Sequence, residues 1–424
     1  MRLGIRPILL YVATTTIALT FSTVPLAAQE PETRADSLEQ MLRILIARID
    51  SLQSVLDSLV SQGRDTTEVV DELAALRAAA RAKVPEAADT VPDKFVLQSR
   101  NLNDFNPEIS VTGDVRLTAN RPGPQVNNVD LREFEFGFQA ALDPYSVAKV
   151  FFSLGEDVFG LEEAYVYWTG LPGGIRLDLG RFRQQAGELN RWHLHSLPQS
   201  EYPLVIQEYL GPDGISGNGL SFYSTLPLQS PGGGVHELWA QPTVGKNPVL
   251  FDNGNRMSIL GHLNNFWQVS RSTYFQLGAT GLYGQNPDTN LVTTVLGANL
   301  RFTWRPPERS LYKSFTIRGE GFAIKKKYGG VGDTKFGWYI ESSYQISRRL
   351  HFSGRLDYVE PLETSNGHNW QTVVNSTFWQ SDWVFIRAEW QHLSVPSLSM
   401  GRATSDLFVL QVVWSLGPHK HESY

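Results

Sequence analysis

The chain has 424 residues, no cysteine and a formal net charge of −6. Without cysteine it has neither a disulfide framework nor a thiolate metal site. The acidic balance offers no attraction to a polyanion, and no nucleic-acid-binding motif is present, so no nucleic-acid partner is expected. The classes that remain need neither thiol chemistry nor a polyanionic partner.

Residues 1–28 predict a secretory signal peptide. Arg2 and Arg6 supply a positive start, an apolar stretch follows from Ile8 to Leu26, and two alanines precede polar residues. A membrane anchor is the alternative, and the threonines within the stretch count against it. Beyond this segment nothing approaches the roughly 18 apolar residues of a spanning helix. An exported chain of this kind can still enter a bilayer as a closed β-barrel, because closure pairs every backbone group.

Residues 36–83 predict an α-helical coiled coil, placed in the periplasm if the chain ends on that side. Apolar residues alternate in spacings of four and three, the seam of a left-handed coiled coil: Leu38, Leu42, Leu45, Ile49, Leu52, Leu56 and Leu59. So short a seam predicts association with partner chains, and an amphipathic helix lying on its own domain stays open as the alternative. Residues 84–106, with Pro85 and Pro92, predict a linker.

From residue 107 to 416 the apolar period changes to two. One run alternates inward and outward residues in this way: Leu350, Phe352, Gly354, Leu356 and Tyr358 against His351, Ser353, Arg355 and Asp357. This is the pattern of strands with one apolar face. The segment predicts an all-β transmembrane barrel of about 16 antiparallel strands, followed by a short tail at residues 417–424.

A soluble β-sandwich has the same alternation, so two further features favour the barrel. Aromatic residues lie near expected strand ends, as in interfacial girdles: Tyr165, Tyr167, Trp168, Trp239, Trp267, Trp304, Trp379 and Trp383. Charges of both signs lie on the polar faces, which fits a wet lumen: Glu341, Arg355, Asp357, Arg387 and Glu389. The soluble sandwich, acting as a tether, stays as the structural alternative.

The most specific segment begins at Leu161. The strand Leu161–Trp168, a Pro-Gly-Gly turn and the strand Ile175–Phe182 are followed by a long loop. This arrangement resembles the phosphate-selective porin family (porins O and P) and its coiled-coil-bearing relatives. The resemblance implies a trimer of 16-stranded barrels whose long loop, here residues 183–217, folds inward to narrow the pore. The expected constriction residues are Arg181, Arg183, Glu188, Arg191, His193 and His195. Acidic and basic residues nearly balance over the barrel, so phosphate selectivity is not expected.

Two His-x-His pairs raise the possibility of a metal site. His193 and His195 lie in the long loop with Glu188 and Glu201 nearby in the chain, and the tail repeats the spacing in His419 and His421. In an extended segment both imidazoles of such a pair face the same side, a usable ligand spacing. Ordinary polar loop residues are the competing interpretation. No other cofactor is expected.

The sequence therefore predicts a homotrimeric porin in outer-membrane lipid that lets small hydrophilic solutes diffuse through a water-filled lumen. A divalent-metal-binding or substrate-specific channel is the first alternative. A barrel enzyme is the second: either histidine could be combined with Ser196, Ser200 or Ser221. Because no Gly-x-Ser-x-Gly or His-Glu-x-x-His motif is present, we expect no enzyme.

Overall fold

The structure is a computed structural model that describes residues 107–122, 129–155, 159–228, 233–252, 254, 256–287, 290–330, 332–363, 367–397 and 401–417. The predicted signal peptide, coiled coil and linker lie outside the described residues, as do His419 and His421. Among the residues described, no helix is long and apolar enough to cross a membrane.

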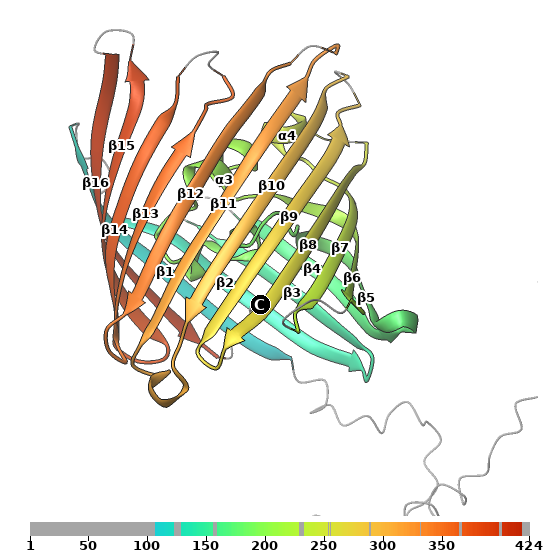
Figure 1. The fold of residues 1–424 in the computed structure, drawn as a ribbon, viewed down its shortest axis with the longest axis horizontal. Coiled ribbons are helices and arrows are strands. Elements are labelled where there is room, and N and C mark those ends of the chain that lie inside the picture. The colour runs from blue at the N-terminus through green and yellow to red at the C-terminus, as the bar shows by residue number, and fades with distance from the viewer. Residues whose placement is uncertain are drawn as a thin grey trace, which may run out of the picture. The chain divides into compact units, whose positions relative to one another are not determined.

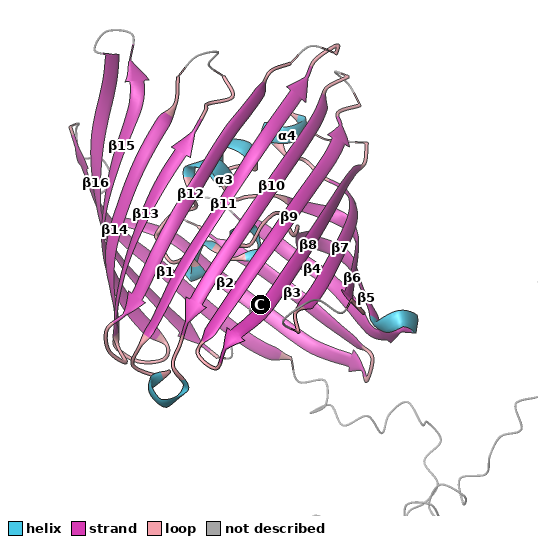
Figure 2. Cartoon of the chain, viewed as in Figure 1, coloured by secondary structure: helices cyan, strands magenta, loops and turns pink. Residues whose placement is uncertain are grey.

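The described residues form one closed barrel of antiparallel strands, in which each strand pairs with its neighbours in the chain and the first pairs with the last (Figures 1 and 2). The strands are β1 (Glu108–Arg121), β2 (Val129–Asp143), β3 (Ser146–Leu154), β4 (Phe159–Leu171), β5 (Ile175–Arg183), β6 (Ser216–Leu226), β7 (Val235–Val244), β8 (Ser258–Ser270), β9 (Thr273–Gln285), β10 (Val292–Trp304), β11 (Ser314–Lys327), β12 (Thr334–Gln345), β13 (Leu350–Val359), β14 (Asn369–Trp379), β15 (Val384–Ser397) and β16 (Gly401–Leu416). The predicted 16-stranded barrel is confirmed.

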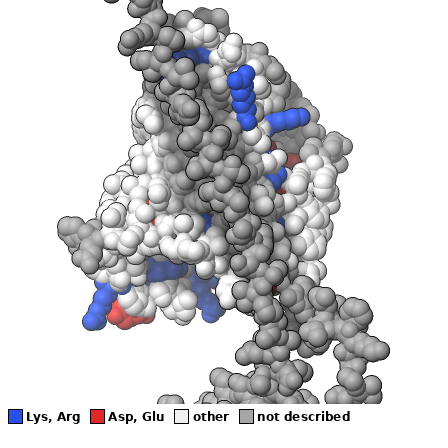
Figure 3. Space-filling view, turned by 90° about the vertical axis from the view of Figure 1, so that its right-hand side faces the viewer, with Lys and Arg blue, Asp and Glu red and all other residues white. Residues whose placement is uncertain are grey.

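Burial along the strands follows the two-residue period of the sequence. On β13, Arg355 and Asp357 are buried while Leu356 between them is 47% exposed. The large apolar side chains point outward and the charged ones inward, the reverse of a soluble sandwich, so that alternative is wrong. Figure 3 shows one side of the barrel, where most of the described surface is uncharged. Such an outer face fits hydrocarbon better than water.

The barrel closes between β1 and β16, with Val115 opposite Val412 in an uninterrupted antiparallel ladder. Closure leaves no strand edge, so every strand has two neighbours for its backbone groups.

Two aromatic residues expected in the interfacial girdles are elsewhere. Tyr165 and Trp239 are each 4% exposed on the inner face, because both occupy the inward parity of their strands.

Within the part of the chain that the structure describes, the helical segments are short. They are η2 (Pro172–Gly174), η3 (Leu189–Arg191), η4 (Leu194–Ser196), α3 (Leu204–Tyr209), α4 (Pro248–Phe251) and η5 (Pro307–Arg309). Three of them, η3, η4 and α3, belong to the connection between β5 and β6. In Figure 2, α3 and α4 lie behind the wall made by β10 to β12, and α3 contacts β11, β12 and β13. The long connection therefore lies inside the barrel.

Candidate functional site

Residues 184–215 join β5 to β6 and occupy the lumen; we call this segment the lumen loop. Its apolar side chains pack with residues of α4 and of the inner wall into one buried cluster: Ala186, Leu189, Leu197, Tyr202, Val205, Ile206, Tyr209, Leu210 and Ile215, with Leu250, Phe251, Leu260, Leu282, Val295, Phe322, Ile324, Tyr339 and Val359. A polar lumen thus holds a dry core on one side, which fixes the loop against the wall from β8 to β13.

Near its beginning, the loop passes very close to the wall residue Glu320 at Gly187. This residue has a φ of +73°, and a Cβ there would lie 1.7 Å from the Glu320 Oε2 atom, so only glycine fits. The Glu320 carboxylate accepts backbone N–H groups of Glu188 at 3.0 Å and Leu189 at 2.9 Å, and the Tyr339 hydroxyl at 2.6 Å. One wall carboxylate therefore satisfies the first turn of the buried loop.

Glu188 binds two arginines of the wall. Its Oε1 atom accepts Arg301 at 2.8 Å and Arg318 at 2.9 Å, and Arg318 also reaches Glu341 at 3.0 Å. Glu188, Arg318 and Glu341 are all buried, so each charge depends on its partners for compensation. The expected constriction residue Glu188 and the expected lumen charge Glu341 thus share one guanidinium.

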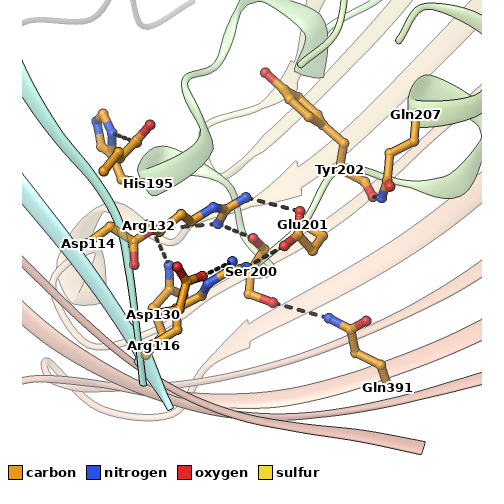
Figure 4. Close-up of polar contacts among 12 residues, drawn as sticks. Asp114, Arg116, Asp130, Arg132, His195, Ser200, Glu201, Tyr202, Gln207 and Gln391 are labelled. Atoms are coloured by element: carbon orange, nitrogen blue, oxygen red, sulfur yellow. Dashed lines mark hydrogen bonds and ion pairs between the residues drawn. The ribbon is translucent and has the colours of Figure 1, made fainter. Parts of the chain in front are cut away.

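The middle of the loop is bound to β1 and β2 through Glu201 (Figure 4). Its two carboxylate oxygens pair with Arg116 of β1 and with Arg132 of β2, the latter at 3.0 Å. Arg132 also donates to the Ser200 carbonyl and lies 3.5 Å from Asp114. Neighbouring strands therefore present two cations to a single loop carboxylate.

Strands β13 and β15, on the other side of the β1–β16 closure, bind the same stretch of loop. Arg355 donates to the Glu201 carbonyl at 2.8 Å, Arg387 donates to the Leu197 carbonyl at 2.9 Å, and Glu389 accepts the Ser200 backbone N–H at 3.1 Å. Arg355 also pairs with Asp357 at 3.0 Å. The expected lumen charges face inward, but in this arrangement they bind the loop.

The two loop histidines meet carboxylates of β2 and β4. His193 Nδ1 contacts Glu135 and lies 3.0 Å from Glu162, while its Nε2 lies 3.4 Å from Glu163. His195 Nδ1 lies 2.8 Å from Glu133. These residues form a compact group, the His–Glu cluster: Glu133, Glu135, Glu162, Glu163, His193 and His195.

The cluster alters the basicity of both imidazoles. Burial by itself lowers the pKa of His193, but the carboxylates of Glu135 and Glu162 outweigh burial and raise that pKa well above its usual value. Burial likewise opposes protonation of His195, and Glu135 and Glu133 raise its pKa. Both imidazoles are therefore more basic than an ordinary histidine side chain.

Arg183 and Arg191 are both buried, one directly before the lumen loop and one within it. Arg183 ends β5 and donates to the Tyr202 hydroxyl at 2.9 Å, the Asp213 carbonyl at 2.8 Å and Glu162 at 2.8 Å. Arg191 is buried at the end of η3. Arg183 therefore lies at the inner wall and Arg191 in the loop, and their role in a constriction stays a prediction.

Arg181 is placed differently from the expectation. It is half-exposed on the outer face of β5, in a shallow groove with Leu179, Ala164 and Asn218, and donates to the Leu161 carbonyl at 2.9 Å. Strand parity explains this, because Asp178 and Phe182 take the inward positions. Arg181 therefore does not line the lumen.

The expected acidic partners of the histidines are also corrected. Glu188 and Glu201 bind arginines, whereas the carboxylates at the histidines come from β2 and β4. The sequence carried a usable signal, since Glu133 and Glu135 share one face of a strand with period two. What it lacked was the pairing that brings this face to residue 193.

Two serines considered for an enzyme have other partners. Ser200 donates to Glu389 and accepts from Gln391 at 3.1 Å, and Ser221 accepts from Gln241 at 3.0 Å. These bonds tie Ser200 of the loop and Ser221 of β6 to carboxylate and amide groups of the wall. These hydrogen bonds anchor the two serines. In neither of them does a histidine act as a base that activates the serine hydroxyl.

Cavities open on both sides of the lumen loop. One of about 580 Å³ is lined by His195, Ser196 and Leu197 together with residues at the beginning of β13. Another, of about 1110 Å³, is lined by Gln207 and Glu208 together with residues just after the end of β13. Because the two lie at opposite ends of the same strand, the loop separates two vestibules.

No protein-family model matches the chain. An uncharacterized protein of Aquifex aeolicus (strain VF5) is 34% identical over 188 residues, which are 37% of this chain and 40% of that protein. The chain thus spans about two fifths of the length of the curated relative that it matches.

Solved structures show the same fold. The anion-selective porin from Comamonas acidovorans has a TM-score of 0.53 at 11% identity, over 73% of this chain and 99% of that one. OprB of Pseudomonas putida has a TM-score of 0.51 at 11% identity, over 76% and 96%. The trimer form of OmpT, an outer-membrane protein of Vibrio cholerae, has a TM-score of 0.50 at 8% identity, over 73% and 99%. The fold is that of the porin barrels.

Proposed function

We propose that this protein is an outer-membrane porin through which small hydrophilic solutes diffuse. The observation that carries the proposal is the closed barrel with apolar side chains outside and charged side chains inside. An apolar outer wall is stable in lipid, and a polar inner wall is stable only against water or polar partners. The fold that the chain shares with bacterial porins supports the same proposal.

The lumen loop sets the size limit in this proposal. Its apolar cluster covers the wall from β8 to β13, and its polar contacts span from β1 and β2 to β15. A solute passing between the two vestibules has to pass beside this segment. The loop is also held by many charged contacts, so we expect a narrow passage of nearly constant width.

The lumen carries charges of both signs close together, such as Arg355 beside Asp357 and Arg318 beside Glu341. Alternating charges produce no extended field of one sign. We therefore propose weak ion selectivity for this pore, without the phosphate preference for which the porin O and P family is named.

We further propose a homotrimer, supported by the outward Arg181. A charged side chain on the lipid face costs about 2–4 kcal/mol at the bilayer midplane, and a neighbouring copy would remove that cost by supplying a polar partner. Small residues in the same groove, Ala164, Gly180 and Gly219, allow close approach of another barrel. The coiled coil predicted for residues 36–83 would hold the three chains together on the periplasmic side.

Planar bilayers test the porin proposal. Purified protein should produce discrete conductance steps in symmetrical KCl, and a salt gradient should give a reversal potential near zero, as weak selectivity requires. Heat-denatured protein at the same concentration is the control. A folded barrel that inserts into the bilayer and gives no steps contradicts the proposal.

Electrophoresis without heating tests the trimer. Deletion of residues 36–83 should lower the temperature at which the trimer dissociates while leaving a heat-modifiable barrel. Arg181→Leu gives a second test, because the two possible placements of Arg181 predict opposite changes in stability. If Arg181 lies in the trimer interface, the substitution weakens the trimer. If Arg181 faces lipid, the substitution stabilises the barrel. A dissociation temperature raised by Arg181→Leu would place the interface elsewhere.

A further inference from the structure

The His–Glu cluster combines nitrogen and oxygen donors from two separate parts of the chain. Two groups within it each bring three ligand atoms within 4.8 Å of one another: Glu133, Glu135 and His195, and Glu135, Glu162 and His193. Glu135 belongs to both. The loop therefore delivers two imidazoles to a wall of carboxylates that β2 and β4 already hold in place.

We propose that this cluster is a binding site for a divalent first-row transition-metal ion, centred on Glu135, with its other ligands supplied by His193 and Glu162 or by His195 and Glu133. Imidazole and carboxylate ligands suit Zn²⁺ and its neighbours in the series. The chain has no cysteine, so it offers no ligand to ions that prefer thiolates. Because both groups of three use Glu135, we expect one ion per chain.

The distances fit such an ion after small movements. In a tetrahedral site with metal–ligand distances of about 2.0–2.2 Å, neighbouring ligand atoms are about 3.3–3.6 Å apart. His193 Nδ1 lies 3.0 Å from Glu162, and His195 Nδ1 lies 2.8 Å from Glu133 and 4.0 Å from Glu135. Each of these separations is within about 0.5 Å of the tetrahedral range. His193 Nδ1 is in direct contact with Glu135 and has to move away from it to admit the ion.

The second nitrogen of His193 has the partner that metal-bound histidines usually have. With Nδ1 on the ion, the Nε2–H group of His193 donates toward Glu163 at 3.4 Å. Glu163 is itself fixed, because it accepts the backbone N–H of Arg183 at 2.7 Å. A carboxylate–histidine–metal series of this kind orients the ring and strengthens the ligand. It points to an ion on the Nδ1 side.

The site also has an entrance and a charge that favours a dication. His195 lines the 580 Å³ vestibule, so an ion reaches the cluster from solvent. Four carboxylates surround two imidazoles, and Arg183 pairs with one of them, Glu162, at 2.8 Å. A bound dication would fasten the lumen loop to β2 and β4, in addition to the arginine contacts of the loop.

Cobalt is the probe for this site, because its visible absorption bands report the ligands and their geometry. Untagged full-length protein in detergent is stripped with EDTA, freed of chelator and titrated with Co²⁺. We expect one Co²⁺ per chain, with a new visible absorption that Zn²⁺ displaces. Folded native protein that takes up no Co²⁺ beyond a detergent blank overturns the proposal.

Matched variants locate the ion. His193→Gln combined with His195→Gln should weaken Co²⁺ binding by more than about tenfold. His419→Gln combined with His421→Gln removes the same His-x-His spacing from the tail and should leave binding unchanged, as should His262→Gln, a buried lumen histidine bonded to Thr280. Binding that survives the first pair and is lost with the tail pair contradicts the assignment.

A variant outside the ligand set covers the case in which the double substitution prevents folding, which heat-modifiable migration reveals. Glu163→Gln keeps the size of the side chain and weakens the outer hydrogen bond, so we expect a loss of about 10- to 100-fold in Co²⁺ affinity. An unchanged affinity counts against the proposal. The measurement needs no bilayer, so its failure leaves the conductance test of the porin untouched, and the reverse also holds.

Discussion

The barrel wall and the lumen loop are built on different principles. In the wall, the strands share a two-residue alternation and each pairs with its two neighbours, so each strand is specified locally and supported by the next one. In the lumen loop, short helical turns are separated by irregular backbone, and most of the segment is buried. Its conformation depends on wall residues that are far away in the sequence.

The comparison shows how a polar lumen can hold a fixed segment. The wall presents charged side chains at fixed positions, and loop backbone or side chains complete their hydrogen bonds: Arg318 with Glu188, Arg355 with the Glu201 carbonyl, and Arg387 with the Leu197 carbonyl. Rigid strands position these groups in advance, so little of the binding free energy is lost in ordering them. The predictions that follow perturb one region and ask whether the other responds.

Arg318→Met should have the largest effect. It removes the buried cation shared by Glu188 and Glu341 and leaves two carboxylates without it, at a cost of about 3–5 kcal/mol in the free energy of unfolding. Urea unfolding of the purified barrel, followed by tryptophan fluorescence, measures the change. Arg301→Met is the control, because the Arg301 side chain is more exposed than that of Arg318, so its effect should be smaller. Equal effects would show that the sharing of Arg318 is unimportant.

Leu356→Arg tests the wall directly. This outward residue lies between the inward Arg355 and Asp357, and a cation on the lipid face near the membrane centre should cost about 2–4 kcal/mol. Leu416, 67% exposed at the end of the last strand, is the matched position where the same change should cost about 0–1 kcal/mol. Refolding yield and unfolding in lipid vesicles compare the two. A Leu356→Arg barrel as stable as the native one would refute a lipid-facing outer wall.

Gly187→Ala tests the close contact between the loop and Glu320. The added Cβ meets the Glu320 carboxylate, so we expect a loss of about 1–3 kcal/mol from the clash and a looser loop that trypsin cleaves faster. Gly174→Ala is the control, since Gly174 also has a positive φ, of +69°, but open space around it. The difference in unfolding free energy and in cleavage rate between the two variants isolates the contact with Glu320. Equal values for the two variants would contradict a close contact at Gly187.

Glu201→Gln should have the smallest effect on stability. About 32% of its side chain is exposed, and the amide keeps one acceptor for the two arginines, so we expect a loss of about 1 kcal/mol. Because it loosens the middle of the loop, it should raise the current noise of the open channel in planar bilayers. Asp130→Asn, which removes a partner of Arg116 outside the loop, should leave the noise unchanged. A quiet Glu201→Gln channel would mean that the other contacts hold the loop alone.

The wall was accessible to sequence reasoning because its information is local. The alternation around Arg355 and around Arg387 predicted which residues face inward, and the strands on either side of the Pro-Gly-Gly turn at residues 172–174 were predicted closely. Parity also explains the errors: the expectation for Arg181 rests on the porin resemblance and those for Tyr165 and Trp239 on residue type, whereas positions in the two-residue period decide which way these residues face.

The site was only partly accessible. The long loop and its two histidines stood out as a polar, irregular segment, but the partners of those histidines did not. Glu133 and Glu135 are about sixty residues away from them in the chain and meet them only because the barrel closes and the loop turns inward. Proximity in sequence suggested Glu188 and Glu201 instead, and both bind wall arginines. Tertiary contacts of this kind leave no local period to detect.

Chemical modification of a single introduced cysteine tests the central claim, that solutes pass beside the lumen loop. The chain has no cysteine, so Ser196→Cys, in the loop beside the 580 Å³ vestibule, is the only target for a cationic methanethiosulfonate. We predict a stepwise fall in single-channel conductance on modification, reversed by a reducing agent, while Ser347→Cys in the exposed turn after β12 shows no change. A Ser196→Cys channel that is fully labelled by mass spectrometry and conducts as before would contradict the account.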